Sequence, residues 1–248
     1  MQDLSFNNLL RTAQRGRFQT LFVSLILFAL MTPFVKHSSF EGVLFYGLLT
    51  LSLAAAVLAV SDQRSLAYVA SALLGIAFMS ITWATFIESS LISNVAANTI
   101  ADGAAFIAFA FTATLILKTV VKPGPVTTEK IFAAVCVYLV SGIAWGLLYV
   151  LVYLNDPSSF MFSYGEPWRE NAPNETSSVF SVFCYFSFVT MTTLGYGDIS
   201  PTSDISRTLA WLQAVLGQLY IAILIARLVG MHAQTEHEQL QIDQPTKK

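Results

Sequence analysis

The chain has 248 residues, of which 55% are hydrophobic and only 11% are charged. A soluble domain of this length cannot hide so much apolar surface, so the composition predicts an integral membrane protein. The net charge of −2 offers no basic surface for nucleic acid, and the two cysteines, Cys136 and Cys184, lie in apolar runs that favour packed thiols over a disulfide framework.

The first half of the chain holds four apolar runs behind a polar start. Residues 1–17 are interpreted as a cytoplasmic N-terminus, because three arginines directly precede the first run. Each run is long enough for a helix that crosses a bilayer, which takes roughly 17 to 25 residues. Together they predict a four-helix membrane domain, residues 18–121, with a loop at 89–99 before the fourth helix. The predicted spans are 18–35, 43–60, 66–87 and 100–121.

The second half begins after a linker at 122–129, where Pro123, Gly124 and Pro125 break the helix. It predicts a second membrane domain, residues 130–230, with two spanning helices that enclose a polar surface loop and a segment too short to cross. That short, aromatic segment is typical of a re-entrant helix. A polar tail, residues 231–248, follows. The predicted elements are a helix at 130–154, the loop at 155–177, the re-entrant helix at 178–191 and a helix at 205–230.

Basic residues predict the topology, because lysine and arginine favour the cytoplasmic side. With the N-terminus inside, ten of the 13 basic residues fall on that side, and only Lys36, Arg169 and Arg207 fall outside. Both termini are therefore expected in the cytoplasm.

The stretch from Thr193 to Asp198 is the part of the sequence that most specifically indicates a function. Gly195 and Gly197 alternate with bulkier residues, so the backbone can adopt positive φ and point consecutive carbonyl oxygens the same way. A row of such oxygens can replace the water shell of an ion. Ligands that are all oxygen, with no fixed carboxylate, suit a weakly hydrated monovalent cation that must also leave.

Thr193-Leu194-Gly195-Tyr196-Gly197-Asp198 resembles the selectivity filter of the tetrameric potassium channels, with Leu194 where the usual form has valine. The resemblance implies an all-α membrane protein with six transmembrane helices, a re-entrant pore helix and a filter strand between helices five and six. Four subunits would surround one pore, because the chain carries a single filter. The implied K+ ligands are the Thr193 hydroxyl and carbonyl and the carbonyls of Leu194, Gly195 and Tyr196, with Gly197 and Asp198 completing the outer mouth.

The resemblance also implies residues that support the filter. The Tyr196 ring is expected to face away from the ions and to pack on Tyr185 and Phe186. Val189 replaces a glutamate that some family members pair with the residue matching Asp198, so Asp198 is expected to pair with Tyr185 or a backbone donor instead. The expected supporting residues are Thr192, Asp198, Tyr185, Phe186 and Val189.

The last helix is expected to supply the inner gate. Gly217 matches the hinge glycine of the family, although a glycine there also suits close helix packing, and the two explanations stay open. One helix face is expected to line the cavity, with its two isoleucines able to form an apolar constriction. That face comprises Ala214, Gln218, Ile221 and Ile225. Arg227 lies off this face and is interpreted as an anchor at the inner membrane interface.

The sequence therefore predicts a homotetrameric potassium channel, with K+ as the permeant ion and no cofactor. Strong voltage sensing is not expected, because the only basic residue of the fourth span is Lys118. A membrane sensor or binding protein that reuses the pore fold without conducting is the alternative, and no catalytic motif supports an enzyme. The expected location is the plasma membrane, in a bacterium the inner membrane, and any regulatory ligand is unknown.

Overall fold

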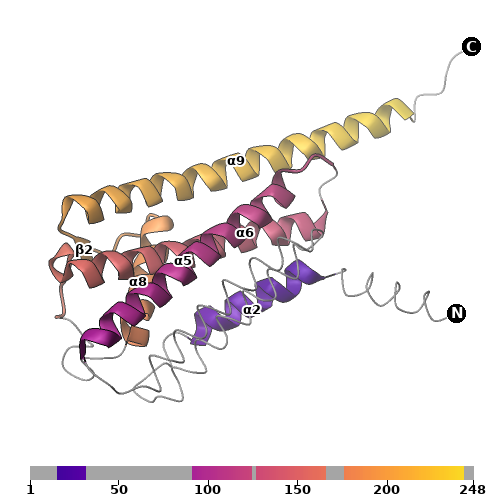
Figure 1. Cartoon of the computed structure of the whole chain (residues 1–248). Coiled ribbons are helices and arrows are strands. Elements are labelled where there is room, and N and C mark those ends of the chain that lie inside the picture. Colours follow the sequence, from indigo (N-terminus) through magenta and orange to yellow (C-terminus); the bar gives the residue numbers. More distant parts are fainter. Residues whose placement is uncertain (1–15, 32–90, 125–126, 166–175, 243–248) are drawn as a thin grey trace, which may run out of the picture.

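The computed structural model describes residues 16–31, 91–124, 127–165 and 176–242 (Figure 1). The predicted spans at 43–60 and 66–87 lie outside these residues. The described helices are α2 (Arg17–Met31), α5 (Leu91–Val121), α6 (Thr128–Asn155), α8 (Thr176–Met191) and α9 (Asp204–Ile242), with a 3-10 turn η2 (Pro157–Ser159) and strands β1 (Phe160–Phe162) and β2 (Ile199–Pro201).

Three of the described helices are long and apolar enough to cross a membrane. Their candidate spans are Asp102–Val121 in α5, Thr128–Asn155 in α6 and Asp204–Arg227 in α9. The apolar parts of α2 and α8, Phe18–Leu30 and Val179–Met191, are shorter. The predicted fourth, fifth and sixth spans and the short segment before the filter are thus present as helices.

Two predicted boundaries are wrong. Helix α5 begins at Leu91, inside the region expected to be a loop. An asparagine costs a helix less than about 1 kcal/mol, so Asn94 and Asn98 do not stop it. Helix α9 continues past Gly230 to Ile242, through the first twelve residues of the expected polar tail. Those residues contain no proline or glycine and several strong helix formers, so an established helix propagates through them.

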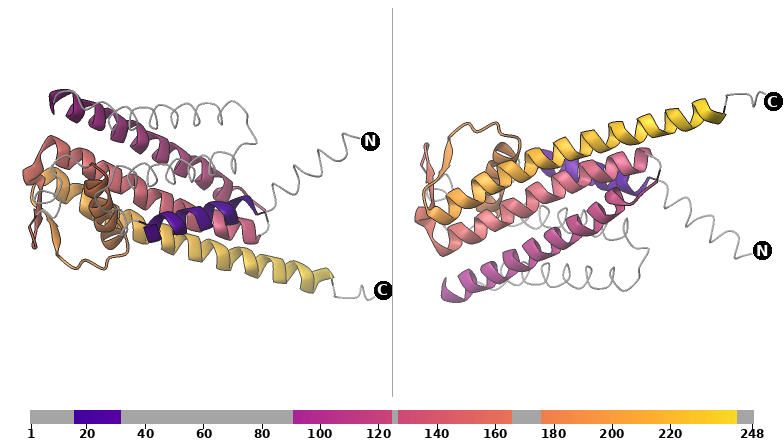
Figure 2. Two further views of the ribbon diagram at one scale, coloured as in Figure 1. Left: turned by 90° about the horizontal axis from the view of Figure 1, so that it is seen from below. Right: turned by 90° about the horizontal axis from the view of Figure 1, so that it is seen from above.

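Hydrogen bonds connect the helices at one end of the bundle, and the two strands lie at the other end. At one end Glu129, in the first turn of α6, accepts a hydrogen bond from the Gly16 backbone N–H at the start of α2, with 2.8 Å between Oε1 and N. Arg227 of α9 donates to the Val121 and Lys122 carbonyls at the end of α5. At the other end, the two strands and the start of α9 lie beyond the end of α6. Helix α9 projects well past the other helices toward the C-terminus (Figure 2).

Aromatic side chains fill the core between α6, α8 and β1. Tyr149 of α6 packs edge-on against Phe186 of α8 and Phe160 of β1, with ring centroids 5.0 and 5.8 Å apart. Phe160 also contacts Phe183 at 4.8 Å. Edge-to-face rings of this kind add directional preference to apolar burial. Helix α8 is therefore held in a defined orientation against α6.

Strands β1 and β2 form a short antiparallel pair in which Phe160 lies opposite Pro201 and Phe162 opposite Ile199. This pairing corrects the prediction of a surface loop across 155–177, because Ser159 and Phe160 are buried. Their burial follows from the pairing with β2, which lies about forty residues later in the chain. The pair joins the segment after α6 to the segment just before α9.

Two glycines let α6 and α8 approach closely. A Cβ added at Gly146 would lie 3.0 Å from Cys184 Cα, which is backbone and cannot rotate away. One turn earlier, a Cβ at Gly142 would lie 2.4 Å from a ring carbon of Phe188. The two positions thus set the distance between the helices.

Replacing Gly146 by alanine should therefore destabilise the protein by about 2 kcal/mol, because the new methyl group meets fixed backbone. The matched control is Gly103→Ala in α5, where no atom lies within 4 Å of the added Cβ. That control should be neutral or slightly stabilising, since alanine favours helices by up to about 1 kcal/mol. Thermal unfolding midpoints in detergent measure both, and equal midpoints would show that the α6–α8 spacing is not set by Gly146.

Candidate functional site

Helix α8 ends in a motif that turns the chain sharply into the candidate filter. The Leu194 N–H donates to the Val189 carbonyl at 2.9 Å, and the Thr193 N–H donates to the Thr190 carbonyl at 3.0 Å. This pair of bonds is the Schellman helix end, which needs a left-handed residue after the cap. Thr193 supplies it with a φ of 59°. A β-branched residue rarely adopts this conformation, so strong local constraints hold Thr193 there.

The backbone beyond the helix alternates in handedness. Gly195 and Gly197 have φ values of 56° and 78°, so positive φ occurs at both glycines as predicted, and Thr193 adds a third such position that was not foreseen. Residues 192–197 are all exposed in the single chain. The oxygen atoms of this stretch are those of the backbone carbonyls, the two threonine hydroxyls and the Tyr196 hydroxyl, and none belongs to a carboxylate. Among the described residues, no group of three His, Cys, Asp or Glu side chains could hold a metal ion.

Asp198 fixes the far end of the stretch through both carboxylate oxygens. Tyr185 Oη donates to Oδ2 at 2.8 Å, and the Ile199 N–H donates to Oδ1 at 3.1 Å. Both kinds of partner considered for Asp198, the tyrosine and a backbone donor, are thus present. Ser163 adds a bond from its N–H to the Asp198 carbonyl at 2.9 Å, which ties the turn after β1 to the same point.

The Tyr196 ring does not have the partners predicted within one chain. Among the described residues it makes no ring contact, and its side chain is 67% exposed. Phe186 is buried against Tyr149 and Phe160 instead, because the aromatic core of α6 and β1 already occupies it. Val189 is buried on the same helix, and the Thr192 hydroxyl donates to the Phe188 carbonyl at 2.7 Å.

Serine and threonine caps join the β1–β2 pair to the start of α9. The Ser206 hydroxyl donates to the Ser159 carbonyl at 2.8 Å and also meets the Ser203 N–H, while the Ser206 N–H donates to the Ser203 hydroxyl. These reciprocal bonds cap the helix. At the end of α6, hydrogen bonds from Ser158 and then Ser159 lower the pKa of the exposed Asp156 carboxyl. All of these contacts stiffen the region around the outer end of the candidate filter.

A buried polar chain that sequence reasoning missed connects three helices. Tyr149 Oη on α6 donates to Gln213 Oε1 on α9 at 2.7 Å. Gln213 Nε2 in turn donates to the Ser187 hydroxyl of α8 at 2.7 Å and to its carbonyl at 3.1 Å. The Ser187 hydroxyl donates onward to the Gly142 carbonyl at 2.6 Å. The available signal was an amide side chain in an apolar run. Gln218 shares this signal, and its helical spacing from Ala214 and Ile221 led to Gln218 being assigned to the predicted cavity face instead.

Gly217 lies against the end of α8. A Cβ at this position would be 2.8 Å from both Met191 Cγ and the Met191 carbonyl oxygen. Gly217 was explained either as a hinge or as a site of close helix packing. The Met191 contact directly supports close packing. Gln218 Nε2 and Tyr138 Oη both reach the same Met191 carbonyl, each at 3.4 Å.

The four residues expected to face the cavity lie along one edge of α9. Ala214 and Ile221 are half-buried, while Gln218 and Ile225 are exposed. Their exposure leaves this edge of the helix available to a neighbouring molecule or to solvent.

Arg227 has a partner that the anchor interpretation did not foresee. Arg227 donates to the Val121 and Lys122 carbonyls. Beside it, Lys130 Nζ donates to the Lys122 and Gly124 carbonyls at 3.1 and 3.0 Å. Two cations thus cap the carbonyl end of α5, where the helix dipole is negative. Arg227 consequently joins α9 to α5.

The segment that holds these features also matches a family model. Residues 135–233, from α6 through the candidate filter to α9, match the model described as "Ion channel". The segment is an ion channel domain. The match confirms the resemblance of this part of the chain to the potassium channel superfamily. No curated protein and no solved structure matches the chain.

Within the ion channel domain, Gln213→Leu should lower stability by about 2 kcal/mol, because it leaves the Tyr149 hydroxyl and the Ser187 hydroxyl without a buried partner. Gln218→Leu is the matched control: it makes the same change five residues later, where the side chain is exposed and its one contact is long. Thermal unfolding should show a lower midpoint for the first variant only. A larger loss for Gln218→Leu would contradict the importance assigned to the buried chain.

Proposed function

We propose that the chain is one subunit of a homotetrameric channel that conducts K+ selectively and passively. The ion channel domain itself rests on the family match. The observation that carries the finer proposal is the alternation of positive φ at Thr193, Gly195 and Gly197 directly after the end of α8.

The ligands proposed for the ion are neutral oxygens. The Thr193 hydroxyl and carbonyl and the carbonyls of Leu194, Gly195 and Tyr196 would replace the hydration shell of K+ at successive sites. Neutral dipoles bind a monovalent cation loosely enough for it to leave again, whereas a carboxylate would hold it. Asp198 fits this scheme because both of its oxygens already bond to Tyr185 and Ile199.

Exposure within the single chain supports an oligomer. Non-helical backbone is tolerated at membrane depth only where protein or enclosed water covers it, yet residues 192–197 are all exposed. Helix α9 is similarly uncovered. Only 17% of the apolar stretch of α9 that could cross the bilayer is buried, against 56% of the corresponding stretch of α6. Its exposed apolar residues include Trp211, Val215 and Leu219. Four copies around one axis would cover these surfaces and surround the ion with four carbonyls at each level.

The inner half of the pathway follows from α8 and α9. The C-terminal end of α8 carries the negative end of its dipole and would favour a cation below the filter. The edge of α9 with Gln218 would offer an amide to hydrated ions, and Ile221 and Ile225 would form the constriction that closes by excluding water. Gly217 would serve close packing on Met191 at the level between filter and cavity.

The basic side chains indicate how the chain is oriented in the membrane and how strongly it responds to voltage. The end of the bundle that holds Lys122, Lys130 and Arg227 would face the cytoplasm, which places the filter mouth outside. Helix α5 carries no arginine, so the channel would respond weakly to voltage.

Ion flux into liposomes that contain the purified protein tests the proposal. We expect uptake of K+ well above that of Na+, and a loss of K+ flux of at least about tenfold in Gly195→Ala, because a side chain at positive φ distorts the row of carbonyls. The matched control is Gly165→Ala, which also replaces a glycine at positive φ, 77°, but lies before α8 and outside the filter. It should keep its flux.

The same measurement separates the channel from a sensor or binding protein that does not conduct. Assembled wild-type protein without selective K+ flux would overturn the proposal, and so would a Gly195→Ala variant that conducts normally. Size-exclusion chromatography of each variant shows whether the oligomer has formed.

Tyr185→Phe tests the support of the filter. It removes one hydrogen bond to the Asp198 carboxylate, worth roughly 1.5 to 3 kcal/mol, and leaves the bond from Ile199. The expected result is a faster decay of K+ current during sustained conduction in planar bilayers. Tyr164→Phe is the control, because Tyr164 is 91% exposed and makes no side-chain hydrogen bond among the described residues. An unchanged decay in Tyr185→Phe would remove the tyrosine from the proposed support.

A further inference from the structure

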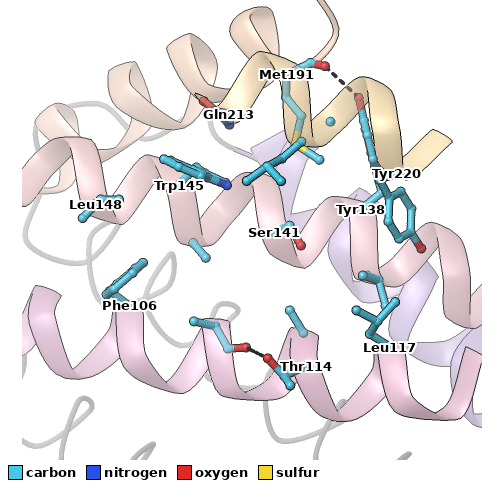
Figure 3. Close-up of a pocket in the computed structure, with 16 residues that line it drawn as sticks. Phe106, Thr114, Leu117, Tyr138, Ser141, Trp145, Leu148, Met191, Gln213 and Tyr220 are labelled. Carbon is cyan, nitrogen blue, oxygen red and sulfur yellow. Dashed lines mark hydrogen bonds between the residues drawn. The ribbon is translucent and has the colours of Figure 1, made fainter. Parts of the chain in front are cut away.

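A cavity of about 470 Å³ lies along α6 between α5 and α9. Figure 3 shows Ser141 and Trp145 of α6 between Phe106 and Thr114 of α5 on one side and Gln213 and Tyr220 of α9 on the other. Met191, at the end of α8, closes the wall nearest the filter. None of the residues that line the cavity is charged. Its volume is in the range of sites that bind small molecules.

The cavity lies at the middle of all three candidate spans. Its α5 residues run from Phe106 to Leu117 within the span Asp102–Val121, and its α9 residues run from Gln213 to Tyr220 within Asp204–Arg227. Ser141 stands at the centre of the α6 span Thr128–Asn155. A molecule in this cavity would therefore lie at the depth of the hydrocarbon core, far from lipid headgroups.

Two hydrogen-bond donors in the wall lack partners among the described residues. They are the Ser141 hydroxyl and the Trp145 indole N–H, which stand one turn apart on the same face of α6. The other polar side chains of the wall are satisfied: Thr114 donates to the Ala110 carbonyl, Tyr138 to Met191 and Tyr220 to the Ala134 carbonyl. Gln213 belongs to the buried chain described above. An unpaired donor at this depth costs free energy, because the bilayer core offers no acceptor.

We propose that this cavity is a binding site for an uncharged, apolar small molecule that carries one hydrogen-bond acceptor and enters from the bilayer. Its apolar body would fill the space between Phe106 and Leu216, and its acceptor, a ketone or amide oxygen, would meet Ser141 and Trp145. A hydrocarbon tail would leave both donors unpaired. An ion would find no charged ligand in the wall.

Photolabelling with benzophenone tests the site, because benzophenone is an apolar ketone that forms a covalent bond with nearby C–H groups under ultraviolet light. Methylene groups beside a thioether react readily, and Met191 lies in the wall. The purified protein in liposomes is illuminated with benzophenone, and the labelled residues are identified by mass spectrometry. Diphenylmethane, which has the same two rings and no acceptor, and the ketone 4-phenylcyclohexanone serve as unlabelled competitors.

We expect label on Met191 that the ketone competes away and diphenylmethane does not. Ser141→Ala and Trp145→Phe should each reduce the label at low benzophenone concentration about fivefold, as the loss of one hydrogen bond predicts. The matched controls are Ser24→Ala and Trp211→Phe, which change the same residue types outside the cavity and should keep the label.

Three results would overturn the proposal: no label in the cavity, equal competition by both compounds, or equal labelling of all the variants. The first would mean that a neighbouring subunit or a lipid tail covers the cavity. The second and third would mean that apolar contact alone holds the ketone. Labelling does not depend on K+ flux, so its failure leaves the channel proposal standing, and a failure of the flux test leaves this site standing.

Discussion

The whole arrangement depends on one constraint: backbone that leaves a helix at membrane depth must find partners for its N–H groups, and its carbonyls must stay free if they are to bind an ion. The end of α8 meets this constraint locally. The Val189 and Thr190 carbonyls accept hydrogen bonds from the Leu194 and Thr193 N–H groups, so the chain reverses without outside acceptors. The carbonyls that follow are then available to an ion. Contacts from α6, α9 and the β1–β2 pair hold this turn in place.

The support combines polar and steric contacts. The Tyr149–Gln213–Ser187 chain links α6, α9 and α8 with each donor and acceptor matched, which fixes their register more sharply than apolar packing would. Close contacts at Gly146 and Gly217 then leave no room for α8 to shift toward either neighbour. At the Asp198 end, the Asp198 carboxylate and the β1–β2 pair hold the other side of the candidate filter. The turn is thus fixed at both ends.

What the sequence predicted well follows from local rules. Long apolar runs mark α6 and α9, a short one marks α8, and two alternating glycines mark the filter stretch. What it missed depends on partners distant in the chain. The Phe160 strand forms only because Pro201 and Ile199 return beside it, and Gln213 is distinguished from Gln218 only by which face of α9 meets α8. The start of α5 was missed for another reason: Asn94 and Asn98 interrupt the apolar pattern, yet each costs a helix less than about 1 kcal/mol and does not stop it.

At Thr193, the residue that would be most stable differs from the residue that the proposed function requires. At a φ of 59° a glycine would cost less than a threonine by roughly 1 kcal/mol or more, since it has no Cβ to clash with the neighbouring carbonyl. Selection for thermal stability alone would accordingly favour glycine at this position. A glycine has no hydroxyl, however, and the proposed innermost oxygen ligand for K+ would be lost with the side chain. A stabilised variant of this protein that carries glycine at position 193 would be expected to be the sturdier molecule and the poorer channel.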